Sequence, residues 1–229
     1  MAMISVDIGN GEQHEYSSGI TAGEVIENVH GRKSGAVAAF VDGMERDMSH
    51  VLDSDCSVEP ITGESEEGSY ILRHSCAHLL AQAVTELFPD AKPTIGPPIE
   101  HGFYYDFHMD SISEDDLKAI GKRMKELVKK NLPISREEHG NESLRSLFSD
   151  NQFKIEIMDD KIGEDVGSSA YRQGDFIDLC RGPHVPSTSH LRWFKLTSTS
   201  QAYWRADKNR ESLVRIYGMC YSTKDGLKE

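Results

Sequence analysis

The chain has 229 residues, of which 38% are hydrophobic and 28% are charged, and its formal net charge is −13. These proportions are typical of soluble globular proteins, and no apolar run approaches the ~20 residues that span a bilayer. Broad, sequence-independent binding to a phosphate backbone uses many Lys and Arg side chains, so the acidic charge argues against it. The first residues lack the pattern of a secretory signal, and the four cysteines lie far apart. We therefore expect a cytoplasmic protein with reduced thiols and no membrane partner.

The length favours one small domain followed by one of medium size, and residues 1–62 are predicted to form the small one. Thr21 is an N-cap candidate with Glu24 three residues later, as in a capping box, which predicts a helix over residues 21–29. Short apolar or alternating runs predict strands at residues 3–8, 13–16, 36–41 and 57–61. These elements predict a small α+β domain in which one helix packs on a mixed sheet.

Residues 63–69 contain only Gly, Glu and Ser, a composition that predicts a linker, and the second domain is then residues 70–229. The helices predicted in this domain cover residues 72–88, 114–130 and 144–148. The strands predicted in it cover residues 153–158, 175–179, 193–197 and 213–221. The second domain is therefore also predicted to be α+β, and larger than the first.

Two pairs of residues in the second domain could carry chemistry. His74 and His78 lie four apart on the first predicted helix, so their imidazoles are neighbours on one helical face. Cys180 and His184 are also four apart, across a Gly-Pro bend, a spacing by which a loop presents two groups to one point. The four residues form a chemically plausible zinc ligand set, and they are equally compatible with an acid–base site without metal.

Several longer strings resemble the proofreading domain of bacterial-type threonyl-tRNA synthetases. They are His-Ser-Cys-Ala-His-Leu-Leu-Ala-Gln-Ala from His74, Ile-Gly-Pro-Pro-Ile-Glu-His-Gly-Phe-Tyr-Tyr-Asp from Ile95, Asp-Leu-Cys-Arg-Gly-Pro-His-Val-Pro from Asp178, and Ala-Tyr-Trp-Arg from Ala202. Their order and spacing match that family, and the resemblance covers essentially the whole chain. It implies a ubiquitin-like β-grasp (TGS) domain at residues 1–62 and, at residues 70–229, the editing domain shared with alanyl-tRNA synthetases, with a long helix carrying His-x-x-x-His. One departure is Ala206, where the family usually has glycine.

The resemblance implies a hydrolase that removes serine from mischarged seryl-tRNA(Thr). A missing methyl group changes binding by only ~1–3 kcal/mol, so a synthetic site that accepts threonine excludes serine poorly, and a second hydrolytic site is the remedy. By resemblance His74 lies near the ribose hydroxyl and a water, and Lys154 activates or holds a second water. From the sequence alone, Lys154 on a predicted strand is equally compatible with a solvent-facing position, and Asp178 with a turn.

The remaining site residues also follow from the matching strings. His78, Cys180, His184 and Asp178 are expected to complete the catalytic set, with Asp178 binding the substrate ammonium or fixing a histidine tautomer. The residues expected to bind substrate are Gly96, Tyr104, Tyr105 and Arg181. The segment Tyr203-Trp204-Arg205 fits either stacking on the terminal adenosine or packing. Lysines on the second helix fit either a solvated face or contact with tRNA phosphates.

The expected partner is the acceptor end of tRNA(Thr) carrying serine, together with the catalytic and anticodon-binding domains of the synthetase if the chain is an excised fragment. The threonyl branch of the family is understood to edit without zinc, so no cofactor is expected. If a metal is bound, we expect zinc at His74, His78, Cys180 and His184. The alternative functions are a zinc-dependent, alanyl-tRNA-type deacylase that acts in trans and a non-catalytic RNA-binding module.

Overall fold

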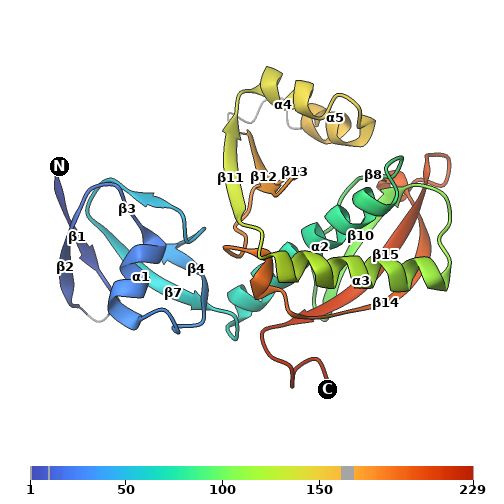
Figure 1. Ribbon diagram of the computed structural model, residues 1–229. Helices are drawn as coiled ribbons and strands as arrows, with labels where there is room; N and C mark the ends of the chain where they lie inside the picture. The colour runs from blue at the N-terminus through green and yellow to red at the C-terminus, as the bar shows by residue number, and fades with distance from the viewer. Residues whose placement is uncertain (1, 10, 161–167, 229) are drawn as a thin grey trace. The chain divides into compact units, whose positions relative to one another are not determined.

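The structure is a computed structural model that describes residues 2–9, 11–160 and 168–228 (Figure 1). Two compact units divide the chain: the first comprises residues 1–72 and 182–186, and the second comprises residues 73–181 and 187–229. Both units combine helices with antiparallel or mixed sheets, which confirms the predicted α+β class. Within the described ranges, no helix is both long enough and apolar enough to cross a bilayer.

The first unit packs one helix on a five-stranded sheet. Its elements are β1 (Met3–Asp7), β2 (Gln13–Ser17), β3 (Ile20–Thr21), α1 (Ala22–His30), β4 (Ala36–Val41), β5 (Met44–Arg46), β6 (Val51–Leu52) and β7 (Cys56–Thr62). The sheet order is β2-β1-β7-β4-β5, in which β1 pairs parallel with β7 and every other pair is antiparallel. The predicted helix on a mixed sheet is therefore confirmed, while the TGS assignment stays a prediction.

The start of α1 follows the predicted capping chemistry. Thr21 Oγ1 accepts the backbone N–H of Glu24 at 3.2 Å, and the Glu24 carboxylate accepts the backbone N–H of Thr21 at 2.8 Å. These two bonds satisfy donors that the first turn of a helix leaves unpaired. Val25 and Ile26 then point into a core that includes Val6 and Val58.

The second unit contains two antiparallel sheets. Its elements are α2 (Glu66–Leu87, which begins in the first unit), β8 (Lys92–Pro93), β9 (Pro98–Ile99), β10 (Gly102–His108), α3 (Glu114–Lys130), β11 (Ile134–His139), α4 (Asn141–Leu147), α5 (Gln152–Asp159), β12 (Ser168–Gln173), β13 (Phe176–Leu179), the 3-10 turn η1 (Thr188–His190), β14 (Trp193–Tyr203), the 3-10 turn η2 (Trp204–Ala206) and β15 (Ser212–Tyr221). One sheet has the order β14-β15-β10-β8, with β9 on β10, and the other has the order β11-β12-β13. Figure 1 shows α4 and α5 side by side near one end of the second sheet.

Two predicted element types or bounds are wrong. Residues 153–158, predicted as a strand, lie in helix α5, because the Asn151 side chain accepts the backbone N–H groups of Phe153 and Lys154 and so caps a helix. Helix α2 begins at Glu66 rather than residue 72, so part of the predicted linker is helical. Ser65 Oγ accepts the Gly68 N–H at 3.1 Å, and Glu66 and Glu67 interact favourably with the helix dipole at this end.

Candidate functional site

Helix α2 places His74 and His78 side by side. Their ring centroids are 5.3 Å apart and the rings are nearly perpendicular, at 84°. The helix is buried on all sides between Ser75 and Val84, so its histidines are held within the unit. Burial lowers the pKa of His74 to about 3, with a further contribution from His78, and burial lowers the pKa of His78 to about 4. Both imidazoles are therefore neutral at pH 7.

A buried ion pair lies next to these histidines. Lys154 Nζ is 2.5 Å from Asp178 Oδ1, and the two side chains are only 3% and 2% exposed. The Tyr105 hydroxyl donates to Asp178 Oδ2 at 2.5 Å, and Lys154 Nζ donates to the Tyr105 hydroxyl at 3.1 Å. Burial alone would raise the pKa of Asp178, but the Lys154 charge, the nearby His78 and the hydrogen bonds outweigh it and lower that pKa. Asp178 is therefore a carboxylate at pH 7, paired with an ammonium.

Short contacts join the ion pair to the histidines. His78 Nε2 lies 3.8 Å from Asp178 Oδ2, and His74 Nε2 lies 3.4 Å from Cys180 Sγ. Since β13 ends at Leu179, it delivers Asp178 and Cys180 to the same place from one strand end. The structure thus brings together, within the second unit, six of the residues predicted for the site: His74, His78, Tyr105, Lys154, Asp178 and Cys180.

Gly96 supports this cluster from behind Tyr105. An added Cβ at position 96 would lie 2.1 Å from Tyr105 Cδ2, a distance that no real contact allows. The glycine therefore lets the backbone pack against the Tyr105 ring, whose hydroxyl reaches Asp178. We expected Gly96 to contact substrate, but its observed contact is with Tyr105.

Three other predicted residues lie apart from the cluster. Tyr104 points to the opposite face of β10 from Tyr105, because side chains alternate along a strand, and its ring lies under the Arg215 guanidinium at 3.8 Å. Arg181 is exposed, and its backbone carbonyl accepts Arg136 Nη1–H at 2.7 Å. His184 belongs to the segment 182–186 of the first unit, where its backbone N–H donates to Asp47 Oδ1 at 2.9 Å.

A cleft of about 330 Å³ borders the ion pair. Lys154 and Asp178 contribute to its wall together with α2, the end of α4, Asn151 and β13. Pockets of a few hundred Å³ are the size that small ligands occupy. The cleft therefore gives a small polar group access to the buried ammonium and carboxylate.

The same cluster offers donor atoms for a metal ion. The ligand atoms of His74, His78 and Cys180 all lie within 4.8 Å of one another. Two imidazole nitrogens and one thiolate are ligands that zinc prefers, so the residues present fit this ion. The cluster could therefore bind zinc, and its geometry is equally compatible with direct hydrogen bonding between His74 and Cys180.

Comparisons with known proteins agree with this geometry. Residues 169–217, which include Asp178 and Cys180, match the family model described as "Threonyl and Alanyl tRNA synthetase second additional domain". A threonine–tRNA ligase of Rubrobacter xylanophilus is 45% identical over 228 residues, which is 99% of this chain and 35% of the relative. The chain resembles the N-terminal part of threonine–tRNA ligases.

Other threonine–tRNA ligases show the same relation. The enzyme of Staphylococcus aureus is 42% identical over 230 residues, and that of Legionella pneumophila is 46% identical over 231 residues. In both cases the match covers nearly all of this chain and 36% of the relative. The chain thus spans about a third of the length of these ligases, and the resemblance predicted from the sequence strings is confirmed.

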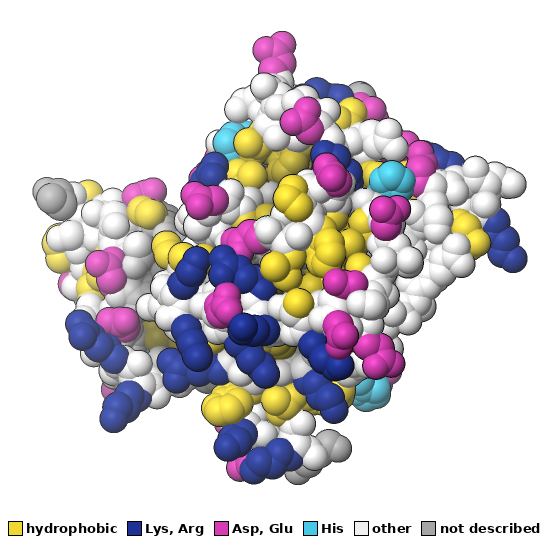
Figure 2. Space-filling model, turned by 45° about the vertical axis from the view of Figure 1, so that its right-hand side comes forward, with side chains coloured by type: hydrophobic (Ala, Val, Ile, Leu, Met, Phe, Trp, Pro, Cys, Tyr) yellow, Lys and Arg dark blue, Asp and Glu magenta, His cyan; other side chains and the backbone are white. Residues whose placement is uncertain are grey.

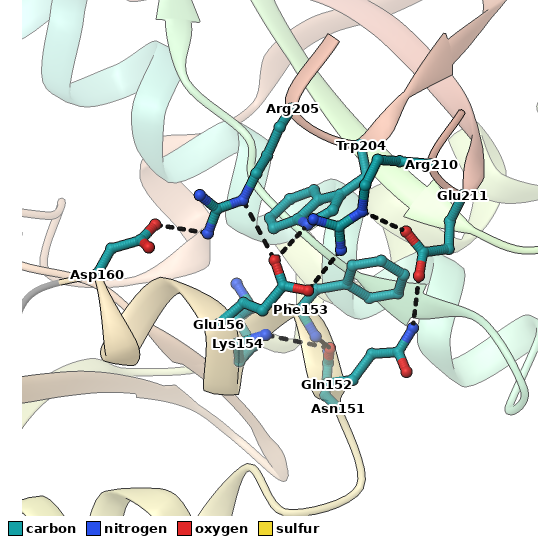
Figure 3. A network of polar contacts seen from close by, with 10 residues as sticks. All are labelled: Asn151, Gln152, Phe153, Lys154, Glu156, Asp160, Trp204, Arg205, Arg210 and Glu211. Carbon is teal, nitrogen blue, oxygen red and sulfur yellow. Dashed lines mark hydrogen bonds and ion pairs between the residues drawn. The ribbon is translucent and has the colours of Figure 1, made fainter. Parts of the chain in front are cut away.

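The sequence strings did not reveal the residues that hold α5 in place. Glu156 accepts hydrogen bonds from Trp204 and Arg210, and Trp204 is buried against Phe153 (Figure 3). Of the two interpretations of Trp204, packing is the one observed. A helical reading of residues 152–159 would have shown the signal, because Phe153, Glu156 and Ile157 then share one face.

Proposed function

We propose that this chain hydrolyses the ester that joins serine to the terminal ribose of tRNA(Thr). The buried Lys154–Asp178 pair beside two neutral histidines carries this proposal, because such a pair is costly to bury and occurs where its charge has a use. The likeness to threonine–tRNA ligases and to the second additional domain supports it. A proofreading hydrolase would be required there, because binding alone discriminates poorly between serine and threonine.

The reaction forms a bond between a water oxygen and the ester carbonyl carbon and breaks the bond from that carbon to the ribose oxygen. The water loses one proton, and the departing ribose oxygen takes one. Neutral His74 is assigned to hold the attacking water and accept its proton, since an uncharged imidazole has a free acceptor nitrogen. The Lys154 ammonium, oriented by Asp178 and Tyr105, is assigned to stabilise the negative charge that develops on the carbonyl oxygen.

The other residues of the cluster are assigned supporting roles. His78 and Asp178 keep the ammonium and the imidazoles in their orientations, and Cys180 contacts His74. The cleft beside Lys154 is the proposed entrance for the serine ester at the acceptor end. Arg181 and Tyr104 lie apart from this cluster and are not assigned to the reacting ester.

The partners proposed for this activity are the serine-carrying tRNA(Thr) and the remaining domains of a synthetase. We propose that the editing domain comprises residues 70–229 and that residues 1–62 form a separate TGS domain. The hydrolysis is proposed to need no cofactor, because an ammonium and neutral imidazoles already supply the groups that ester cleavage uses. We place the activity in the cytoplasm, where charged tRNAs are used.

A zinc-dependent deacylase is the second candidate, favoured by the donor set on α2 and β13. His74, His78 and Cys180 would hold the ion, with His184 as the proposed fourth ligand. Bound zinc would supply a Lewis acid for the ester carbonyl or for water. Zinc analysis of protein purified without added metal separates the two candidates: stoichiometric zinc that is lost in His78→Ala supports the second one.

The deciding experiment is a single-turnover assay with excess protein and radiolabelled seryl-tRNA(Thr), run beside threonyl-tRNA(Thr). We expect serine release well above spontaneous hydrolysis and little threonine release. His74→Ala and Lys154→Ala should each lower the rate by about 10²-fold or more, since each removes a group that acts on the transition state. Circular dichroism checks that both variants fold.

Three outcomes would contradict the proposal. Equal release of serine and threonine would remove the proofreading role. Binding of tRNA without any release would favour the RNA-binding module. Full activity in both folded variants would show that His74 and Lys154 do not have the assigned roles.

A further inference from the structure

Helix α5 carries Lys154 but is too short to be stable alone. It has eight residues, Gln152–Asp159, and isolated helices shorter than ~12 residues are marginal in water. Its contacts with the rest of the second unit must therefore keep it folded. The same contacts determine where the Lys154 side chain begins.

One face of α5 packs on the connection between β14 and β15. Phe153 and Trp204 make an edge-to-face contact with ring centroids 5.1 Å apart, and Leu213 completes their buried cluster. Ile157, one turn after Phe153, packs against the same cluster. An apolar contact of this kind fixes the distance between α5 and the sheet.

A polar network on the same face determines the position of α5 along and around its axis (Figure 3). Trp204 Nε1–H donates to Glu156 Oε2 at 2.8 Å, and Arg210 Nη2–H donates to Glu156 Oε1 at 2.5 Å. Arg205 Nε lies 3.2 Å from Glu156 Oε2, and Arg205 Nη2–H donates to Asp160 Oδ2. We call Glu156, Asp160, Trp204, Arg205 and Arg210 the α5 latch.

Lys154 lies on an adjacent face of the same helix. At about 100° per residue, its side chain leaves α5 a quarter-turn away from Phe153 and reaches Asp178. A helix of two turns moves as one body, so a rotation or slide at the latch displaces Lys154 as well. Reactions depend strongly on such positions: a misplacement of ~1 Å can lower a rate by about 10²-fold.

We propose that the α5 latch positions Lys154 for hydrolysis and that Glu156, which contacts three members of the latch, is a positioning residue that acts through Lys154. This inference rests on the proposed function. It extends that function by assigning a role to the β14–β15 connection, which touches none of the reacting groups. Glu156 itself does not contact Asp178 or the histidines in the described structure.

The first test measures α5 directly and does not need activity. In the full chain, Glu156→Gln should increase the hydrogen-exchange rate of amides 154–159 by roughly tenfold while leaving exchange in α2 unchanged. Glu27→Gln is the matched control, because Glu27 also pairs with an arginine, Arg32, and the substitution changes the charge equally. Unchanged exchange in α5 would show that the latch does not hold the helix.

The second test is a double-mutant cycle in the single-turnover assay. Glu156→Gln should lower the rate of serine release roughly tenfold, with the half-saturating protein concentration changed less than about twofold. In a Lys154→Ala background the same substitution should have less than about a twofold effect, because the group it positions is gone. Independent, multiplicative losses in the cycle would overturn the positioning role.

A further variant protects the test against misfolding. Trp204→Phe keeps the ring that packs on Phe153 and removes only the N–H that Glu156 accepts. It should show the same pattern as Glu156→Gln, with smaller changes. If the wild-type chain releases no serine, the proposed function fails and the exchange test alone decides whether the latch holds α5. If serine is released normally by Glu156→Gln despite faster exchange, the latch fails as a positioning device and the proposed function stands.

Discussion

Gly96 is packed so tightly against Tyr105 that no side chain fits between them. In Gly96→Ala, the new methyl group would push the Tyr105 ring away from Asp178 and weaken the hydrogen bond between them. We expect a loss of ~1–3 kcal/mol in the free energy of unfolding, measured with urea, and a lower rate of serine release. The effect is steric, so it is predicted even though alanine is the smallest possible replacement.

Gly121 provides the matched control for this prediction. It lies inside α3, and an added Cβ there would only meet Leu196 Cδ1 at 3.9 Å. Gly121→Ala should therefore stabilise the chain by ~0.5–1 kcal/mol, because alanine favours a helix interior. Equal stability changes in the two variants would contradict the packing argument.

The two histidines of α2 make stability depend on pH. Their pKa values fall to about 3 and about 4 in the folded chain, against about 6.5 when unfolded. The unfolded chain therefore binds more protons between pH 6.5 and pH 4, and stability contributed by the neutral rings is lost as pH falls through this range. The expected slope is up to about 1.4 kcal/mol per pH unit for each histidine.

Urea unfolding between pH 7 and pH 4 measures this dependence. His78→Gln should flatten the curve, because glutamine does not titrate. His101→Gln should leave it unchanged, since the His101 side chain is 82% exposed. A curve of the same slope in all three proteins would show that the buried histidines are not responsible.

At the scale of elements, the turn η2 carries backbone strain. Arg205 and Ala206 have φ values of 54° and 59°, in the left-handed region that favours glycine. Ala206→Gly should relieve part of this strain and stabilise the chain by up to about 1 kcal/mol, measured as an increase in the urea midpoint. Ala202→Gly, in the extended strand β14, should instead destabilise it.

The opposite order of stabilities would show that the turn is not strained in solution. The prediction also explains the one departure noted in the sequence strings, because a family that usually has glycine at this position avoids this cost. The latch residues Trp204 and Arg205 lie in the same turn, so it must keep its shape. Alanine is tolerated there at the expense of stability.

Helix α5 shows where element prediction from sequence reached its limit. Residues 153–158 alternate in a way that fits a strand, yet they form a helix with Phe153 and Ile157 on one face. Asn151 decides between the two, since its side chain caps the helix and also donates to the Pro93 carbonyl of β8. That second bond is long-range, so a local pattern cannot reveal it. By contrast, α1 and α3 were predicted with their N-caps, because Thr21 and Ser113 act within four residues.

At the scale of the whole molecule, a chain of net charge −13 must bind RNA locally. Figure 2 shows Lys and Arg side chains gathered over α3. Four exposed lysines of this helix recur at spacings of four, three and four and so form one stripe: Lys118, Lys122, Lys125 and Lys129. We expect Lys122→Glu with Lys125→Glu to weaken tRNA binding about tenfold or more and to reduce its salt dependence by about one log unit per lost phosphate contact.

Filter binding at several salt concentrations checks this expectation. Lys224→Glu with Lys228→Glu reverses the same charge at exposed positions near the last described residue and should have a much smaller effect. If both double variants weaken binding equally, net charge rather than the α3 stripe governs the interaction. An unchanged rate of serine release at saturating protein would separate binding from catalysis.

The sequence by itself determined the α+β class, the capped helices α1 and α3, and the resemblance to threonine–tRNA ligases, because these depend on periodicity, local capping and contiguous strings. It also placed His74 and His78 on one helix. Only the tertiary structure decided that Lys154 is buried on Asp178, that Tyr105 rather than Tyr104 faces the site, and that Gly96 serves Tyr105. These contacts join residues 24 to 73 positions apart in the chain, and packing between elements, which no local pattern encodes, selects them.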